Sequence, residues 1–200
     1  MAHAITTAPH PLDTNTGVDN RKLLMWFFLA SDCLFFGSFI AAYLLYRDRN
    51  IVGPYQSDLY DIPFTSVSSF VLLMSSLTMV LALAAIQRGD LRGMRIWLIA
   101  TALLGITFIS GQAFEFTEFW NAGLSLDQNL FGTTFFVLTG FHGAHVAIGV
   151  LILLSLVHAS TTGKLTEKNS LAVELGGLYW HFVDIVWIVI FTLVYLIQPQ

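Results

Sequence analysis

The chain has 200 residues, of which 56% are hydrophobic and 11% charged, and its mean hydropathy is +0.70. Soluble globular domains carry about 25% charged residues, so the composition argues against a soluble protein. The small net charge of -4 does not indicate nucleic acid as a partner, and the single cysteine excludes an internal disulfide and a cysteine-ligated metal cluster.

Five apolar runs follow one another along the chain. A helix needs about 20 mostly apolar residues, at about 1.5 Å each, to span a bilayer. The prolines lie outside the cores of these runs, and no alternating strand pattern occurs. The sequence therefore predicts an all-α integral membrane bundle of five transmembrane helices in a single membrane domain, 1–200. The predicted helices cover residues 23–46, 64–86, 94–116, 131–157 and 175–197.

The basic residues predict how the chain is oriented. A polar N-terminal tail, 1–21, has no apolar stretch like that of a signal peptide, so we expect no cleavage there. Seven of the nine lysines and arginines lie at the end of this tail, at the start of the first run, or in the second and fourth connections. Because basic residues favour the cytoplasmic side, the N-terminus is expected in the cytoplasm and the C-terminus outside.

Ionisable side chains within the runs are the first candidates for function, because each costs about 2.5–3.5 kcal/mol to insert into a membrane. Counted from the predicted helix ends, Asp32, His145 and Asp184 lie within about 5 Å of one level. Glu115 is expected near the outer surface, apart from this layer. The full set is Asp32, Glu115, His142, His145, Glu174, His181 and Asp184.

Two pairs of these residues are spaced three apart, so each pair shares a helix face: His142 with His145, and His181 with Asp184. One interpretation is metal or haem ligation by histidines of two helices. The other is polar packing, in which each histidine hydrogen-bonds a carboxylate or backbone group and holds two helices in register. We favour packing, because paired carboxylates of the di-iron type are missing from the sequence and His142 and His181 differ in depth by about 9 Å.

Asp32 has two interpretations that the sequence leaves open. A carboxyl group in hydrocarbon can hold a proton, which suits a proton relay, and it can equally be a structural group at a helix contact. No nucleophile–base pair, phosphate loop or zinc signature occurs, which argues against a freestanding enzyme.

Glycines are expected to let helix backbones approach one another. These are Gly140, Gly143, Gly149, Gly176 and Gly177.

Four segments, in order along the chain, resemble haem–copper oxidase subunit III. Residues 133–149, TTFFVLTGFHGAHVAIG, resemble a long family signature, and residues 178–187, LYWHFVDIVW, match its Tyr-Trp-His-Phe-Val-Asp-x-Val-Trp motif. Residues 30–36, ASDCLFF, and 104–116, LGITFISGQAFEF, are similar to two shorter family segments. The chain looks like the last five helices of a seven-helix plan, as in short bacterial members.

The resemblance implies a non-redox subunit of a proton-pumping terminal oxidase, which reduces oxygen to water. Such a subunit holds no haem or copper, which belong to partner subunits. It packs against subunit I, beside other subunits such as II and IV, binds phospholipid and supports proton uptake, here in the bacterial cytoplasmic (inner) membrane. The family motifs carry over to Glu115, His142, His145, Trp180, His181 and Asp184, while Asp32 stands where the family usually has glutamate.

Other functions remain as alternatives. The chain could serve a related nitric oxide reductase, or a quinol oxidase rather than a cytochrome c oxidase. It could also be an independent membrane haem protein or a transporter, although the sequence shows neither repeat symmetry nor helices broken near the midplane, which transporters often have.

Overall fold

The computed structural model describes residues 17, 19–47, 61–124, 130–166 and 169–197. Five of its helices are long and apolar enough to cross a membrane, and the described residues form no β-strand. The predicted all-α class with five spanning helices is therefore confirmed. The elements are α1 (Asn20–Tyr46), α3 (Ile62–Gln87), α4 (Leu91–Asn121), α5 (Leu130–Thr161) and α6 (Ser170–Phe191), which continues into a π-helical turn, η2 (Thr192–Leu196).

Aspartates cap three of the helix starts. The side chains of Asp19, Asp61 and Asp90 each accept a hydrogen bond from a backbone N–H in the first turn of α1, α3 and α4. Such caps satisfy amide groups that have no partner within the helix. Gly89 precedes the third cap with a φ of +79°, a conformation that favours glycine, and so allows the tight turn between α3 and α4.

The helices differ in length from the apolar runs. Helix α4 continues to Asn121, beyond the predicted end at 116, and α5 continues to Thr161, beyond 157. Hydropathy marks the apolar part of a helix, whereas backbone hydrogen bonding continues through polar turns at its ends. The π-helical turn η2 has no counterpart in the prediction, and most of the predicted tail, 1–21, lies outside the described residues.

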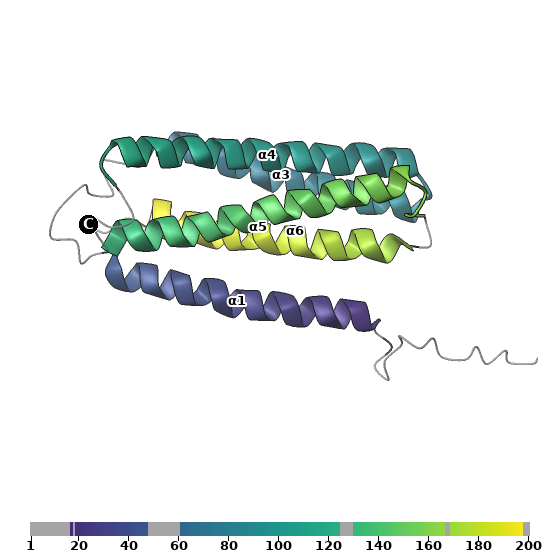
Figure 1. The fold of residues 1–200 in the computed structure, drawn as a ribbon, viewed down its shortest axis with the longest axis horizontal. Coiled ribbons are helices and arrows are strands. Elements are labelled where there is room, and N and C mark those ends of the chain that lie inside the picture. The colour runs from purple at the N-terminus through teal and green to yellow at the C-terminus, as the bar shows by residue number, and fades with distance from the viewer. Residues whose placement is uncertain (1–16, 18, 48–60, 125–129, 167–168, 198–200) are drawn as a thin grey trace, which may run out of the picture.

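Four helices form a closed ring, and the fifth lies outside it. Helix α3 contacts α4 and α6, and α5 also contacts α4 and α6. Helix α1 packs against α5 and α6 (Figure 1). Within its most apolar window, α1 has only 6% of its residues buried, against 50% for α6 with η2. The core of the molecule therefore lies inside the ring, and α1 borders it.

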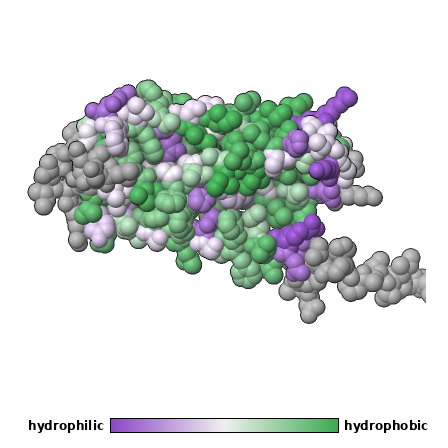
Figure 2. Space-filling view, viewed as in Figure 1, coloured by the Kyte–Doolittle hydropathy of each residue, from purple (hydrophilic) through white to green (hydrophobic). Residues whose placement is uncertain are grey.

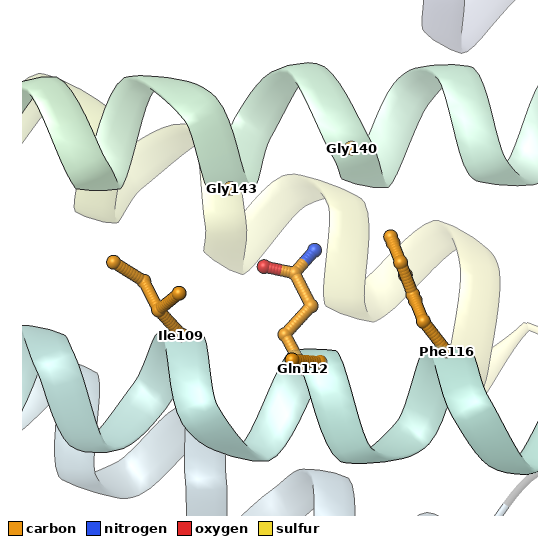
Figure 3. Close-up of a pocket in the computed structure, with 6 residues that line it drawn as sticks. Ile109, Gln112, Phe116, Gly140 and Gly143 are labelled. Atoms are coloured by element: carbon orange, nitrogen blue, oxygen red, sulfur yellow. The ribbon is translucent and has the colours of Figure 1, made fainter.

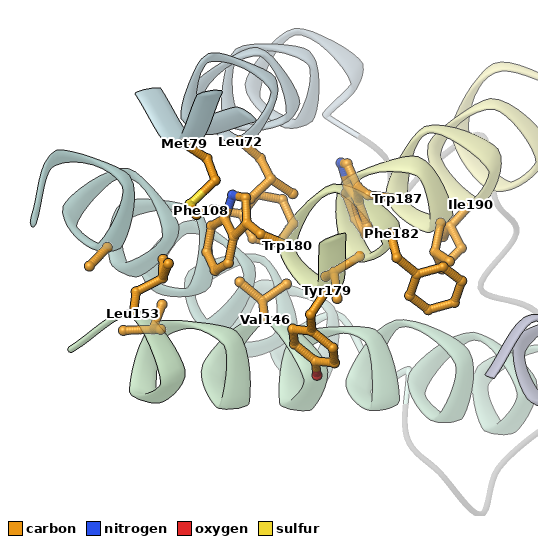
Figure 4. Close-up of a cluster of buried hydrophobic side chains, with 14 of the residues drawn as sticks. Leu72, Met79, Phe108, Val146, Leu153, Tyr179, Trp180, Phe182, Trp187 and Ile190 are labelled. Carbon is orange, nitrogen blue, oxygen red and sulfur yellow. The ribbon is translucent and has the colours of Figure 1, made fainter. Parts of the chain in front are cut away.

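The centre of the ring is packed around Trp180 of α6 (Figure 4). A Cβ atom added to Gly105 of α4 or to Gly149 of α5 would lie 2.6 Å or 2.8 Å from its ring, so only glycine leaves room for the indole. Its Nε1 donates a hydrogen bond to Ser75 Oγ of α3 at 2.8 Å. One side chain thus joins all four helices of the ring.

The expected role of the glycines is confirmed at four of five positions. A Cβ on Gly143, Gly149, Gly176 or Gly177 would lie within 3.2 Å of a side chain on a neighbouring helix. Gly140 differs, because an added Cβ would have no neighbour within 4 Å. No other helix in the described part of the chain packs closely on Gly140, so the prediction for this glycine is not tested by the chain alone.

The outward surface is largely apolar. Figure 2 shows hydrophobic residues over much of the visible face, with hydrophilic residues at its two ends and a few near its middle. Large apolar side chains of α1 are exposed, among them Phe27 at 68% and Leu34 at 78%. In a soluble protein such a surface would be covered by a partner, whereas in a membrane lipid can cover it.

Candidate functional site

Three of the predicted residues lie at the same relative depth. Asp32, His145 and Asp184 each fall within one residue of the middle of their helices, α1, α5 and α6 with η2. Two of them meet: Asp32 Oδ2 lies 3.6 Å from His145 Nε2, and these side chains are only 14% and 16% exposed. This contact connects α1 to α5.

One hydrogen bond fixes the orientation of the His145 ring. Its Nδ1 lies 2.7 Å from the carbonyl oxygen of Phe141, one turn earlier in α5. Because a carbonyl only accepts, Nδ1 must carry the hydrogen, and Nε2 is left facing Asp32. At 3.6 Å the contact is longer than a hydrogen bond, and Asp32 Oδ2 has no hydrogen-bond partner among the described residues. The pair is therefore a close approach of two ionisable groups from two helices.

A second polar cluster joins α3 to α6. The Ser76 hydroxyl lies 3.0 Å from His181 Nδ1 and also hydrogen-bonds Asp184 Oδ2. A hydroxyl has one hydrogen, so one of the two contacts must use a proton of the histidine or of the aspartic acid. Asp184 is 3% exposed, and its Oδ1 has no hydrogen-bond partner within the described part of the chain.

Glu115 makes hydrogen bonds to two other helices, which its predicted place near the outer surface did not suggest. It is buried, and its Oε1 accepts a hydrogen bond from Thr65 Oγ1 at 2.7 Å. Its Oε2 accepts from the Tyr195 hydroxyl at 3.1 Å. The carboxylate therefore links α4 to α3 and to η2, separately from the mid-depth contacts.

His142 does not behave as its sequence interpretation predicts. It is fully buried, and neither ring nitrogen has a hydrogen-bond partner among the residues that the structure describes. Its ring instead stacks on Trp187 at a centroid distance of 4.8 Å, with the edge of Phe108 at 5.9 Å. Three residues correspond to about 300° around a helix, so His142 and His145 are about 60° apart and reach different neighbours. The expectation that each histidine hydrogen-bonds a carboxylate or backbone group is wrong for His142.

No three histidine, cysteine, aspartate or glutamate side chains come together as a metal site in the described ranges. The predicted residues therefore form separate contacts between pairs of helices. Asp32 contacts His145, and the Ser76 hydroxyl contacts both His181 and Asp184. His142 lies among aromatic rings.

The serines of α3 are the partners that the sequence interpretation missed. Ser69 Oγ accepts a hydrogen bond from Trp187 Nε1 at 2.8 Å, as Ser75 does from Trp180. Ser69 and Ser76 are seven residues apart, which is two helical turns, so they share one side of α3. Serines repeated at that spacing in an apolar run are a signal for interhelical hydrogen bonds.

The geometry and the motifs agree with one known family. The family model described as cytochrome c oxidase subunit III matches residues 10–198. The chain belongs to the cytochrome c oxidase subunit III family. The resemblance carried by the sequence motifs is thereby confirmed.

Relatives of this subunit III chain come from two kinds of bacterial oxidase. It is 35% identical to cytochrome c oxidase subunit 3 of Bacillus sp. (strain PS3), over 98% of this chain and 94% of the relative. It is 36% identical to quinol oxidase subunit 3 of Bacillus spizizenii, over 97% and 95% of the two chains. Identity to cytochrome c oxidase subunit 3 of Synechocystis sp. is 40%, over 86% and 72%. The chain is thus a multi-pass membrane subunit of an oxidase complex.

Proposed function

We propose that this chain is the non-redox subunit III of a proton-pumping haem–copper terminal oxidase in the bacterial cytoplasmic membrane. It stabilises subunit I, binds phospholipid and supports proton uptake, in contact with other subunits such as II and IV. Haem and copper belong to the partner subunits, and no catalytic centre lies in this chain. Family membership and the exposed position of α1, held by Asp32 and His145, support this proposal.

Lipid binding is supported by how little of α1 the rest of the chain covers. The helix contacts only one side of the ring, through α5 and α6, and its outward apolar side chains are exposed. A spanning helix in this position is covered by acyl chains or by a partner helix. Longer family members have two further helices, and the face that they would border is here filled by phospholipid or a neighbouring subunit.

Support for proton uptake comes from the pair of Asp32 and His145. These two ionisable side chains face each other at mid-depth, at the edge of the bundle rather than inside the ring. Asp32→Asn keeps the size of the side chain and removes its acid. We expect slower steady-state proton uptake by the purified oxidase, and an unchanged rate would argue against a relay.

The distribution of basic residues indicates how the chain is oriented in the membrane. Basic residues gather at the end of the bundle where α1 begins, α3 turns into α4, and α5 turns towards α6, and the positive-inside rule places that end in the cytoplasm. The N-terminus is then cytoplasmic and the C-terminus outside. The basic residues at this end are Arg21, Lys22, Arg88, Arg92, Arg95 and Lys164.

A pull-down of the tagged chain from its native membrane in mild detergent tests the proposal. Co-purification of a large subunit that contains haem and copper is the expected result. A chain recovered alone would contradict the proposal, and haem iron without copper would favour a nitric oxide reductase. The electron donor, cytochrome c or quinol, follows from assaying the purified complex with each.

A further inference from the structure

A notch opens between α4 and α5 on the outward surface, with a volume of about 190 Å³. Figure 3 shows the two helices on either side, with the Gln112 side chain between them. None of the polar contacts described above includes a residue of this notch. Its lining residues are Ile109, Gln112, Ala113, Phe116, Gly140 and Gly143.

Gly140 leaves this space unused by the chain itself. An added Cβ there would meet nothing within 4 Å, whereas one on Gly143 would lie 2.6 Å from Gln112 Oε1. Gly143 thus makes room for Gln112, and Gly140 leaves the surface of α5 open. A small residue on an open helix surface, such as Gly140, allows a second helix to approach the backbone closely.

Gln112 supplies a hydrogen-bond acceptor in the notch. The residue is 6% exposed, and its Nε2 donates to the carbonyl oxygen of Thr139 at 2.7 Å. That bond sets the amide orientation and leaves Oε1 beside Gly143, where no described residue donates to it (Figure 3). Gln112 is six residues from the middle of α4, about 9 Å, so it lies within the hydrocarbon layer.

We propose that the notch is the docking site for a transmembrane helix of another oxidase subunit, which donates an N–H or O–H hydrogen bond to Gln112 Oε1. An acyl chain fills apolar space but has no donor, and water is scarce at this depth. A helix that carries a serine, threonine, tyrosine or tryptophan supplies both the apolar contact and the donor. This inference rests on the proposed membership in an oxidase and adds which face meets a partner.

Gly140→Leu tests the site, because a Cβ there has no neighbour within 4 Å and the longer side chain occupies space in the notch. Gly140→Ala is the graded control, since it adds only the Cβ, which has no neighbour within 4 Å in this chain. Each tagged chain is purified with its complex in detergents of increasing strength, and every co-purifying subunit is measured per tagged chain. We expect retention of the docked subunit to fall roughly tenfold for Gly140→Leu, equivalent to losing about one hydrogen bond together with its packing, and to fall much less for Gly140→Ala.

A photo-crosslinking residue at Ala113, which is exposed in the notch, gives an independent measurement in the otherwise unaltered complex. Crosslinks to another subunit are expected. Crosslinks to lipid alone, or equal retention for Gly140→Leu and wild type, would overturn the docking site while leaving the proposed function intact. A wild-type chain that retains no metal-containing subunit would instead contradict the proposed function.

Discussion

Helices α6 and α1 show two ways in which a spanning helix is held. Half of the most apolar window of α6 with η2 is buried, and its tryptophans donate hydrogen bonds to serines of α3. The corresponding window of α1 is 6% buried, and α1 meets its neighbours through aromatic contacts, the contact of Asp32 with His145 and the ion pair of Lys22 with Glu174. The ring is therefore stabilised from within, whereas the position of α1 depends on polar contacts and on what surrounds the chain.

The largest effect is expected for Trp180→Ala, which tests whether packing around this tryptophan stabilises the four-helix ring. The substitution empties the space that Gly105 and Gly149 leave for the indole, and it removes the hydrogen bond to Ser75. Large-to-small changes of this kind cost about 3–5 kcal/mol. Thermal unfolding of the purified oxidase, followed by release of this chain, measures the loss.

Trp26→Ala on α1 is the control for that experiment. Trp26 is 62% exposed, so the same change should stay within about 0.5 kcal/mol of wild type. Equal effects of the two substitutions would mean that the ring is not held by its tryptophan packing.

Asp184→Leu should have the next largest effect. It leaves the Ser76 hydroxyl, which also contacts His181, without its carboxylate partner, at a cost of about 1–3 kcal/mol. We expect weaker association with subunit I, or loss of bound phospholipid, measured by subunit stoichiometry and lipid analysis of the purified complex. Asp184→Asn keeps an acceptor for Ser76 and should be milder. A mutant complex with normal lipid, stoichiometry and turnover lifetime would show that this cluster is unimportant.

Asp32→Leu should loosen the packing of α1 without changing the stability of the four-helix ring. Loss of the contact with His145 is expected to cost about 1 kcal/mol, typical of a polar contact between membrane helices. Cys33 is exposed on α1 and is the only cysteine of the chain, so a spin label there reports the mobility of this helix. Greater mobility with an unchanged unfolding temperature of the ring is the expected result. A label as immobile as in wild type would mean that aromatic contacts hold α1 without the contact between Asp32 and His145.

The sequence was sufficient for the spans and for the depth of Asp32, His145 and Asp184, because both follow from hydropathy and from the helical rise. It was not sufficient for partners, which depend on which helices are neighbours. Asp32 and His145 meet because α1 packs on α5, and Ser76 reaches Asp184 because α3 packs on α6.

Two residues show why side-chain surroundings were harder to predict. Glu115 is near the end of its apolar run, which predicted a place near the outer surface but no partner, yet η2 brings the Tyr195 hydroxyl to it. His142 shares a broad helix face with His145, but the difference of about 60° places it among aromatic rings. Neither the π-helical turn nor the direction of a neighbouring helix is visible in the hydropathy pattern.

The smallest effect is expected at the end of α1, where Lys22 Nζ lies 2.6 Å from Glu174 Oε1 of α6. Both side chains are about one-third exposed, so water and salt screen the pair, and its contribution should be about 0.2–1 kcal/mol. A double-mutant cycle with Lys22→Ala and Glu174→Ala, read from the Cys33 spin label, isolates this coupling. It should shrink as salt increases, whereas the contact of Asp32 with His145, with side chains only 14% and 16% exposed, should respond little to salt. If salt weakened both couplings equally, the mid-depth pair would be in contact with water. Solvent would then screen the polar contacts of α1 equally at its end and at its middle.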